Sequence, residues 1–142
     1  MFNIYCDGGC SGNPGPGGYG MVVMNDNNDI VIEKFSDYSN MTTNNIEELK
    51  GLIRSLEYCQ MHPQDKFIIW VDSAYAIGCI VTWAPGWENN NWTRPKGKEI
   101  KNLDLVKKGY YLYSILQNCE IRKIKGHSGI IGNELADKLT KK

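Results

Sequence analysis

Two acidic side chains in this sequence stand where strands are expected to end. Asp7 follows the alternating apolar residues of 1–6 and precedes a loop rich in glycine and proline, and Asp72 directly follows the apolar run "FIIWV". If these strands are parallel neighbours, both carboxylates emerge at the carboxyl edge of the sheet, where open sheets place ligands. Each acid also has an ordinary explanation, Asp7 as a turn former and Asp72 as a helix N-cap.

A third acid comes from the helix predicted over residues 42–60. The apolar positions of this segment form one stripe at a helical spacing of about 100° per residue. Glu48 lies at the edge of the stripe, whereas Glu47 falls nearly opposite to it. We therefore expect Glu48 to point toward the sheet edge and Glu47 to face solvent, so that Glu47→Gln should be nearly silent and Glu48→Gln severe. Asp137, in a predicted terminal helix, by itself resembles a surface acid.

The charges of the chain divide between its two parts. The 142 residues have a formal net charge of zero, but residues 1–89 carry 4 Lys and Arg against 11 Asp and Glu, whereas residues 90–142 carry 12 against 5. A net charge of −7 in one part and +7 in the other suits a protein that binds metal ions with one region and a polyanion with another. A solvated run of charges is the alternative.

The composition indicates one ordinary globular domain, residues 1–142, because 42% of the residues are hydrophobic and 23% charged. Five scattered cysteines without a CxxC pair argue against a disulfide framework and a structural zinc site. Neither an export signal nor a long apolar run is present, so we expect a cytoplasmic protein that does not use a membrane.

The order of the predicted elements indicates a mixed α/β sheet. Strands are expected over residues 1–7, 19–25 and 30–36, followed by the helix over 42–60 and a strand at 67–71. A second helix begins near residue 73, and after an irregular stretch to residue 99 come a helix, a strand and a terminal helix. Three antiparallel strands followed by alternating helices and strands predict a five-stranded sheet whose later strands return in parallel through helical crossovers.

Four segments, in this order and at these separations, resemble type I ribonuclease H, the enzyme that cleaves the RNA strand of an RNA–DNA hybrid. They are "DGGCSGNPGPGGYG", "TTNNIEEL", "VDSAY" and "KGHSGIIGNELAD", and the resemblance covers essentially the whole chain. The resemblance implies the ribonuclease H-like fold, with helices flanking the mixed sheet. It further implies a monomeric endonuclease whose catalytic and metal-binding residues are Asp7, Glu48, Asp72 and Asp137, with His127 as an additional catalytic residue.

Such a set of acids suits phosphodiester hydrolysis by two divalent ions. The ions activate a water, stabilise the leaving alkoxide and neutralise charge, and Mg²⁺, with Mn²⁺ as a substitute, prefers carboxylate oxygen. The expected products carry 5′-phosphate and 3′-hydroxyl ends. His127 is not required as a metal ligand, and the resemblance implies that it accepts a proton or assists product departure.

The resemblance also implies contacts with the hybrid. The residues expected near the RNA strand are Gly8, Cys10, Asn13, Asn44 and Asn45, where 2′-hydroxyls distinguish RNA from DNA. Thr43 would hold a phosphate of the DNA strand, although Thr43 and Asn44 could equally be N-caps.

Residues 82–102, here called the handle, keep the family spacing of Trp83, Trp87 and Trp92. Stacking on the substrate is one role for these rings, Trp83 included, and packing the handle onto the domain is the role expected for at least two of the three. The segment Glu88 to Asn91 replaces residues that are basic in many members, and Ala74 replaces glutamine, so the grip on the substrate is expected to be modest.

Two other functions are less compatible with the sequence. "GPGGYG" at residues 15–20 matches the dinucleotide-binding pattern GxGxxG, but it continues into a predicted strand rather than a helix. The second is a non-catalytic module that binds RNA–DNA hybrids on the same fold. All four acids are present, which favours the enzyme.

Overall fold

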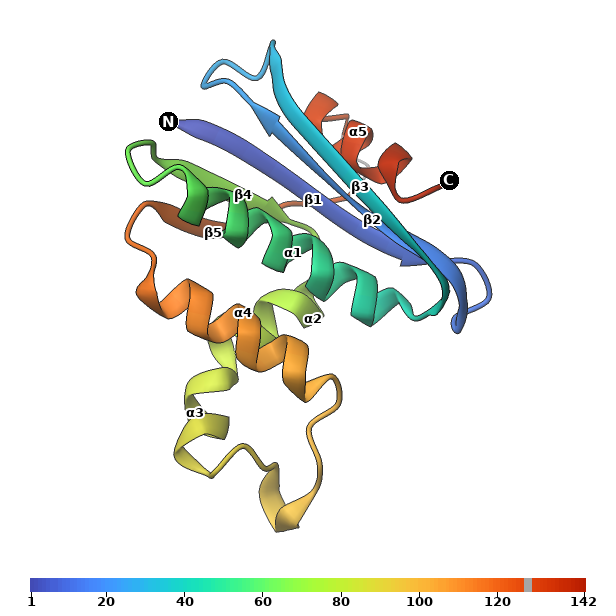
Figure 1. Cartoon of the computed structure of the whole chain (residues 1–142), viewed down its shortest axis with the longest axis vertical. Helices are drawn as coiled ribbons and strands as arrows, with labels where there is room; N and C mark the ends of the chain where they lie inside the picture. Colours follow the sequence, from blue (N-terminus) through green and yellow to red (C-terminus); the bar gives the residue numbers. More distant parts are fainter. Residues whose placement is uncertain (127–128) are drawn as a thin grey trace.

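A five-stranded mixed sheet forms the centre of the molecule (Figure 1). The computed structural model describes residues 1–126 and 129–142. The strands are β1 (Phe2–Cys10), β2 (Gly15–Met24), β3 (Val31–Thr42), β4 (Phe67–Val71) and β5 (Cys119–Lys123). Their order is β3-β2-β1-β4-β5, with β1 antiparallel to β2, β2 antiparallel to β3, and β4 parallel to both β1 and β5. The predicted mixed sheet is confirmed.

The first three strands are longer than the sequence pattern predicted. Strand β1 runs through Asp7 to Cys10, because Asp7 and the residues after it pair with the glycine-rich start of β2. Residues 15–20 are part of β2, so the GxGxxG pattern does not open a helix. Strand β3 continues to Thr42, immediately before the first helix. The paired strands therefore extend beyond the end of β4 and form one wall of the sheet edge where the acids gather.

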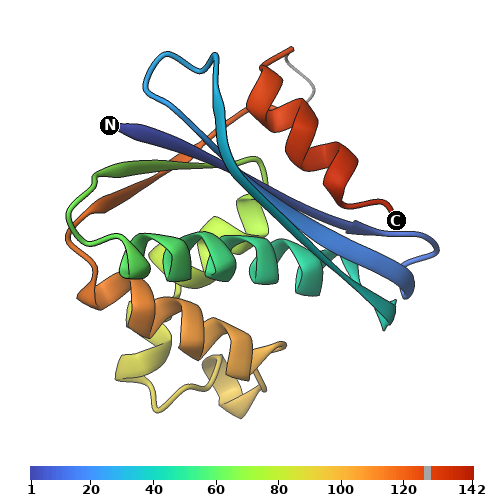
Figure 2. The same ribbon diagram turned by 45° about the horizontal axis from the view of Figure 1, so that its top comes forward.

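Helices cover both faces of the sheet, as Figure 2 shows. Helix α1 (Asn44–Met61) lies on one face and packs against α4 (Leu103–Ile115), and α5 (Ile131–Leu139) lies on the other. Alternate residues of β1 divide between two apolar clusters, because Ile4 and Cys6 join the large cluster beneath α1 while Tyr5 joins a smaller one beneath α5. The sheet is thus covered on both sides, as the apolar run at β4 predicted.

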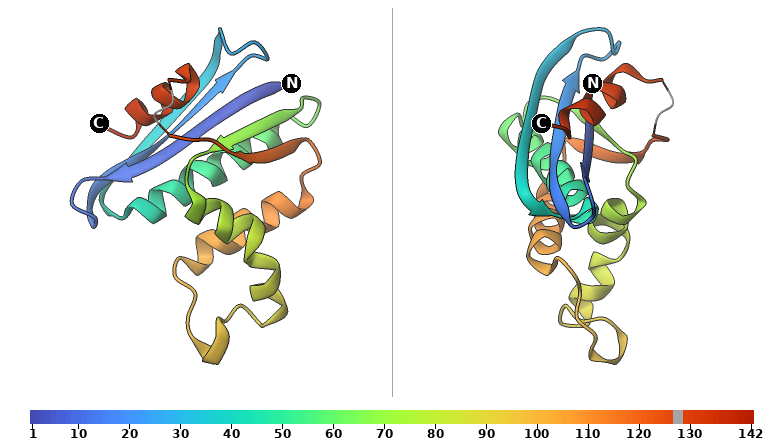
Figure 3. Two further views of the ribbon diagram at one scale, coloured as in Figure 1. Left: turned by 180° about the vertical axis from the view of Figure 1, so that it is seen from behind. Right: turned by 90° about the vertical axis from the view of Figure 1, so that its right-hand side faces the viewer.

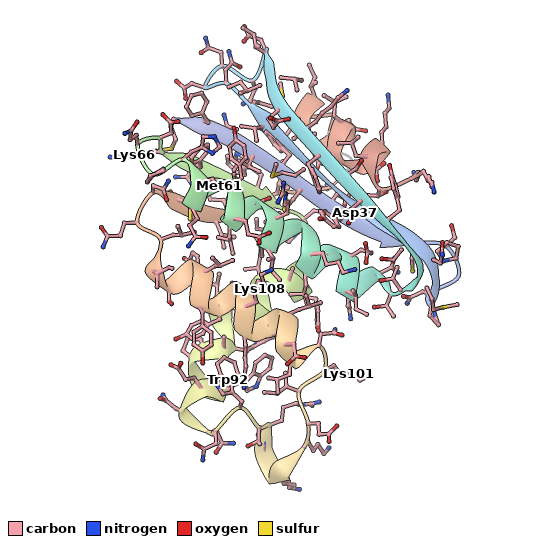
Figure 4. All side chains as sticks on the ribbon, viewed as in Figure 1. Asp37, Met61, Lys66, Trp92, Lys101 and Lys108 are labelled. Carbon is pink, nitrogen blue, oxygen red and sulfur yellow. The ribbon has the colours of Figure 1, made fainter. Side chains whose placement is uncertain are left out.

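The handle projects away from the sheet, as the two views of Figure 3 agree. It follows α2 (Ala74–Ile77) and the π-helical turn η1 (Gly78–Thr82), contains α3 (Ala84–Asn89) and the short 3₁₀ turn η2 (Pro95–Gly97), and leads into α4. The predicted irregular stretch therefore contains one short helix. Figure 4 labels Lys101, just before α4, and Lys108 within α4. Basic residues from the second part of the chain therefore lie where the handle joins α4. Among the described residues, no helix combines the length and apolar character needed to cross a bilayer.

Close approach between helices and sheet depends on two glycines of the β1–β2 pair. A Cβ at Gly8 would lie 2.3 Å from the backbone carbon of Glu47 and 2.4 Å from the nitrogen of Glu48, so the first turns of α1 contact β1 directly. A Cβ at Gly20 would lie 2.7 Å from the carbonyl oxygen of Ala136 in α5. These glycines allow helices on opposite faces to approach one end of β1.

We expect Gly8→Ala to lower the free energy of unfolding by about 1–3 kcal/mol, because the new methyl group meets backbone that cannot rotate away. Gly86→Ala in α3 is the matched control, since no atom lies within 4 Å of its added Cβ. Its effect should stay within about 0.5 kcal/mol. Urea unfolding of the two variants measures the difference, and equal stabilities would show that β1 and α1 can separate without cost.

Candidate active site

The register of the parallel strands brings Asp7 and Asp72 together. Pairing between β1 and β4 ends at Cys6 and Val71, so each acid is the next residue after the last pair. By the alternation of the two strands, both side chains leave the sheet on the face covered by α5. The proximity expected from the sequence is supported by electrostatics, because the charge of Asp72 contributes to raising the pKa of Asp7.

The other two acids come from helices on opposite faces of the sheet. Glu48 lies in the second turn of α1, next to the backbone that contacts Gly8. Asp137 lies in α5, and its proximity contributes to raising the pKa of Asp7. The charge of Asp72 raises the pKa of Glu48, whereas the nearby side chain of Ser73 lowers it. The structure therefore gathers all four predicted acids at one edge of the sheet.

Burial and the charges of neighbouring acids make Asp7 and Glu48 resist ionisation. Burial raises the pKa of Asp7 to about 7, and the charges of Asp72 and Asp137 act in the same direction, while the N–H of Gly8 donates to Asp7 Oδ1 at 2.9 Å and opposes them. Burial also raises the pKa of Glu48, and the charge of Asp72 adds to this effect. A bound cation would relieve the repulsion.

Three of the four acids line an open cavity of about 600 Å³. One wall is the end of β1 from Asp7 to Ser11, and another is Asn44 at the start of α1. Ser39 and Asn40 of β3 and the residues after α5, Thr140 to Lys142, complete the lining together with Pro16, Gly17 and Tyr38. The terminal lysines were not singled out from the sequence, although Lys141 follows Asp137 by one helical turn and its Nζ lies 3.8 Å from Asp137 Oδ2. The cavity is acidic at its base and carries cations at its rim.

The capping residues separate two explanations that the sequence left open. Ser73, and not Asp72, caps α2, because its hydroxyl oxygen accepts from the N–H of Ala76 at 3.0 Å. Asp72 is therefore not used as a cap. Thr43 is the N-cap of α1 and accepts from the N–H of Ile46 at 3.2 Å, whereas Asn44 is the first residue inside the helix.

The glycine-rich loop is tied to the start of α1 by asparagine side chains. The backbone N–H of Asn44 donates to Asn13 Oδ1, and Asn44 Oδ1 accepts from the N–H of Cys10, both at 2.9 Å. Three of the five residues expected near RNA thus contact one another, and Gly8, Cys10 and Asn44 line the cavity. Asn45 and Thr43 are not among its lining residues.

The tryptophans of the handle follow the expectation that at least two of them pack. Trp87 and Trp92 are partly buried against the large cluster, and Trp92 contacts the rings of Tyr110 and Tyr111 on α4. Trp83 is 45% exposed. It lines a second cavity of about 380 Å³, together with Tyr75, Cys79, Trp87, Arg94, Ile100 and Lys101, and this cavity is separate from the acidic one.

The structure corrects the expectation for Glu47 and does not reach His127. Glu47 is 1% exposed, not facing solvent, and α1 packs against β2 as well as against β1. Thr42, at the end of β3, donates to Glu47 Oε2 at 2.7 Å. The helical phase identified the side of Glu47 but not what lies against it. His127 lies outside the described residues, and its role stays a prediction from the sequence.

The donor chemistry of the acids fits hard divalent ions. Carboxylate oxygens are the ligands that Mg²⁺ prefers, and repulsion within the group favours a cation between them. Over residues 1–126 and 129–142, no three acidic, histidine or cysteine side chains form a ready-made coordination sphere. Mg²⁺ keeps several of its waters and is held by one or two carboxylates plus substrate phosphate, so an open group of acids meets its requirements.

Comparison with known proteins agrees with this geometry. The sequence profile of the RNase H family matches residues 1–142. The chain belongs to the type I ribonuclease H family. It is 37% identical to a ribonuclease H from Cyanothece sp. over 143 residues, covering 97% of this chain and 85% of the relative. Ribonuclease HI from Shewanella oneidensis is 38% identical over 144 residues, covering 99% and 85%.

Two solved structures show the same architecture. LC9-RNase H1, a type 1 RNase H with the type 2 active-site motif, superposes with a TM-score of 0.80 at 29% identity, covering 98% of this chain and 69% of the other. LC11-RNase H1, solved in complex with an RNA/DNA hybrid, gives a TM-score of 0.71 at 26% identity, covering 99% and 94%. The family resemblance and the fold predicted from the sequence are confirmed, and the chain is a ribonuclease H, an endonuclease.

The raised pKa of Asp7 predicts how the stability of this family member depends on pH. In the unfolded chain Asp7 titrates near its usual value of 3.8, whereas in the folded chain its pKa is about 7. The folded state therefore holds the proton more tightly, and stability present below pH 4 is lost as the pH rises through 7. Without divalent metal, Asp7→Asn should exceed the wild type in unfolding free energy by about 2 kcal/mol at pH 8, after a discount for partial solvent screening.

The difference between Asp7→Asn and the wild type should shrink toward zero near pH 4. Denaturant unfolding in EDTA across this range measures it, with Asp65→Asn at an exposed position as the control. A wild type as stable as Asp7→Asn at pH 8 would contradict the proposed repulsion.

Proposed function

We propose that Asp7, Glu48, Asp72 and Asp137 hold two divalent ions, Mg²⁺ or Mn²⁺, with which this ribonuclease H cuts the RNA strand of RNA–DNA hybrids. The observation that carries the proposal is the convergence of four acids from two strands and two helices at one edge of an open cavity. When bound, the ions would activate a water and stabilise the leaving alkoxide. The products would carry 5′-phosphate and 3′-hydroxyl ends.

Each acid is positioned by a different part of the fold. Asp7 and Asp72 are fixed by the parallel register of β1 and β4, and both line the cavity. Glu48 is held against Ser73, which caps α2. Asp137 enters from the opposite face of the sheet on α5. His127, which precedes α5 in the chain, is proposed to accept a proton from the attacking water or to assist product departure.

Residues that line the acidic cavity, together with others outside it, supply the proposed contacts with the hybrid. Gly8, Cys10, Asn13, Asn44 and Asn45 are proposed to approach the RNA strand, Thr43 to hold a phosphate of the DNA strand, and Trp83 to stack on a sugar or base of the substrate. The mutual hydrogen bonds of Asn13, Asn44 and Cys10 support this role, because they preorganise the polar backbone beside the acids. LC11-RNase H1 was solved with an RNA/DNA hybrid, which makes such a duplex the appropriate substrate for the test. We further propose a monomer that acts in the cytoplasm.

We expect Asp72→Asn to abolish turnover and to leave the fold intact, because Asp72 makes no cap that the fold requires. The loss in kcat should be about a thousandfold, as when several kcal/mol of transition-state stabilisation are removed. Gel analysis of strand-labelled hybrids with Mg²⁺, Mn²⁺ or EDTA measures it, and circular dichroism checks folding. Cutting of the DNA strand, or full activity in EDTA, would contradict the proposal. Hybrid binding without cleavage by the wild type would instead favour the non-catalytic module.

The handle gives a separate test of substrate contact. Glu88 accepts a hydrogen bond from Tyr110 at 3.3 Å and Asn90 bonds to Thr93, so replacing either disturbs local structure. Asn89 is the exposed last residue of α3, and its side chain forms no hydrogen bond with the described residues. Asn89→Lys therefore adds a charge without breaking a local hydrogen bond.

If the handle lies along the duplex, Asn89→Lys should lower KM at low salt and leave kcat nearly unchanged, because the handle is distant from the acids. The slope of log KM against log salt should change by up to about 0.9 for one added phosphate contact. Asn27→Lys, in the turn between β2 and β3 at the other end of the molecule, is the control (Figure 1). If the slope of log KM against log salt is the same for both variants, the handle is not part of the surface that binds the duplex.

A further inference from the structure

A buried carboxylate lies next to the proposed metal ligands without belonging to them. Glu47 is 1% exposed, and its Oε2 accepts from the hydroxyl of Thr42 at 2.7 Å and lies 3.4 Å from Lys50 Nζ. Its second oxygen, Oε1, is buried without a hydrogen-bond partner among the described residues. Buried carboxylates are costly, and an unpartnered oxygen adds to the cost. Glu47 is therefore poorly explained as a device for stability.

Thr42 and Glu47 occupy two positions at the start of α1 that contact each other in many helices. With Thr43 as the N-cap of α1, Thr42 is the residue before the cap and Glu47 is the fourth residue of the helix. In many helices these two positions hold apolar side chains whose contact fixes the direction in which the chain enters the helix. Here a hydrogen bond between buried polar groups occupies that place, since Thr42 is 4% exposed.

The segment directed by this hydrogen bond forms a wall of the acidic cavity. Thr42 is the last residue of β3, and Asn44 follows two positions later. Asn44 bonds to the glycine-rich loop through its backbone N–H and its Oδ1, and it lines the cavity. A rotation of the first turn of α1 relative to β3 would therefore displace the polar groups proposed to meet the RNA strand. The Thr42–Glu47 bond acts at the junction that sets this rotation.

We infer that Glu47 is a positioning residue for substrate binding, which through its hydrogen bond to Thr42 sets where Asn44 meets the hybrid. The inference rests on the proposed function of the cavity. A hydrogen bond is directional, whereas an apolar contact tolerates sliding, so the polar pair defines one orientation of the segment. Lys50, whose Nζ also lies 3.4 Å from Ser39 Oγ, forms an ion pair with the same carboxylate oxygen, Oε2.

The test separates positioning from stability by replacing both partners at once. Thr42→Val and Glu47→Met, made singly, should each lower stability and raise KM, because each leaves a buried polar group without its partner. In the double variant both polar groups are gone, and stability should return to the wild-type level or exceed it. KM for the hybrid should nevertheless remain raised by about fivefold, as expected for the loss of one hydrogen bond. We expect kcat and the Mg²⁺ dependence to change by less than about twofold, because the acids keep their places.

Conservative variants keep the test informative if a single variant fails to fold. Glu47→Gln retains an oxygen that accepts from Thr42 and should keep KM near the wild-type value. Glu57 lies on α1, as Glu47 does, and forms an ion pair with Lys108 of α4. Glu57→Gln removes that ion pair, so it is the matched control and should have no effect on KM. Binding of the hybrid to the double variant in an Asp72→Asn background should weaken by the same factor as KM.

Two outcomes would overturn the inference. A double variant whose KM returns together with its stability would show that the pair serves only to join α1 to β3. A Gln variant as impaired as the Met variant would show that the charge, and not the hydrogen bond, is required. Failure of the wild type to cleave the hybrid is a different result, which would contradict the proposed function itself.

Discussion

The site depends on how closely two helices approach one pair of strands from opposite sides. Helix backbone approaches the strands closely where a side chain is absent, as at Gly8 for α1 and at Gly20 for α5. In the β1–β2 register, Gly20 stands opposite Asp7, so both approaches occur beside the first acid. The interior is close-packed, and a single methyl group at either glycine would separate the helix from the sheet. The position of the acids is thus set by backbone contact rather than by side-chain packing.

The same closeness places like charges together, and the fold supplies few groups that reduce their repulsion. The N–H of Gly8 donates to Asp7, the side chain of Ser73 lowers the pKa of Glu48, and Lys141 lies near Asp137. These contacts only partly offset burial, as the raised pKa values of Asp7 and Glu48 indicate. The basic residues lie mainly in the second part of the chain, and of these Lys141 and Lys142 line the acidic cavity together with Asp137.

Much of this arrangement could be read from the sequence. Alternation in β1 and the apolar run of β4 predicted two parallel strands, and the residue after each apolar stretch identified Asp7 and Asp72. Helical phase identified Glu48. Asp137 could be singled out only by resemblance, because its local sequence is that of an ordinary amphipathic helix, and its approach to Asp7 depends on contacts between segments distant in the chain.

The failure at Glu47 has a specific physical cause. A helical wheel assumes one buried face, but Thr42, at the end of a β3 longer than its hydrophobic pattern indicated, donates to the buried carboxylate of Glu47. The pairing of Thr42 with Gly15 holds that end in place, and such pairing beyond the apolar core leaves no hydrophobic signal. The hydrophobic pattern of a sequence therefore does not predict where a strand ends when that end is held only by backbone hydrogen bonds.

The four acids are carried by elements that are not equally firmly packed, because α5 lies over a small apolar cluster. Asp7, Glu48 and Asp72 extend from elements that share the large cluster, whereas α5 is attached through Tyr5, Val22, Met24, Ile124 and Ala136 with a few partly buried neighbours. Elements with less buried apolar surface open at lower free energy than the body of a protein. Asp7, Glu48 and Asp72 are therefore held by one packed unit, whereas Asp137 depends on the separate packing of α5. Thermal loss of the complete set then begins with undocking of one helix, ahead of the cooperative unfolding of the domain.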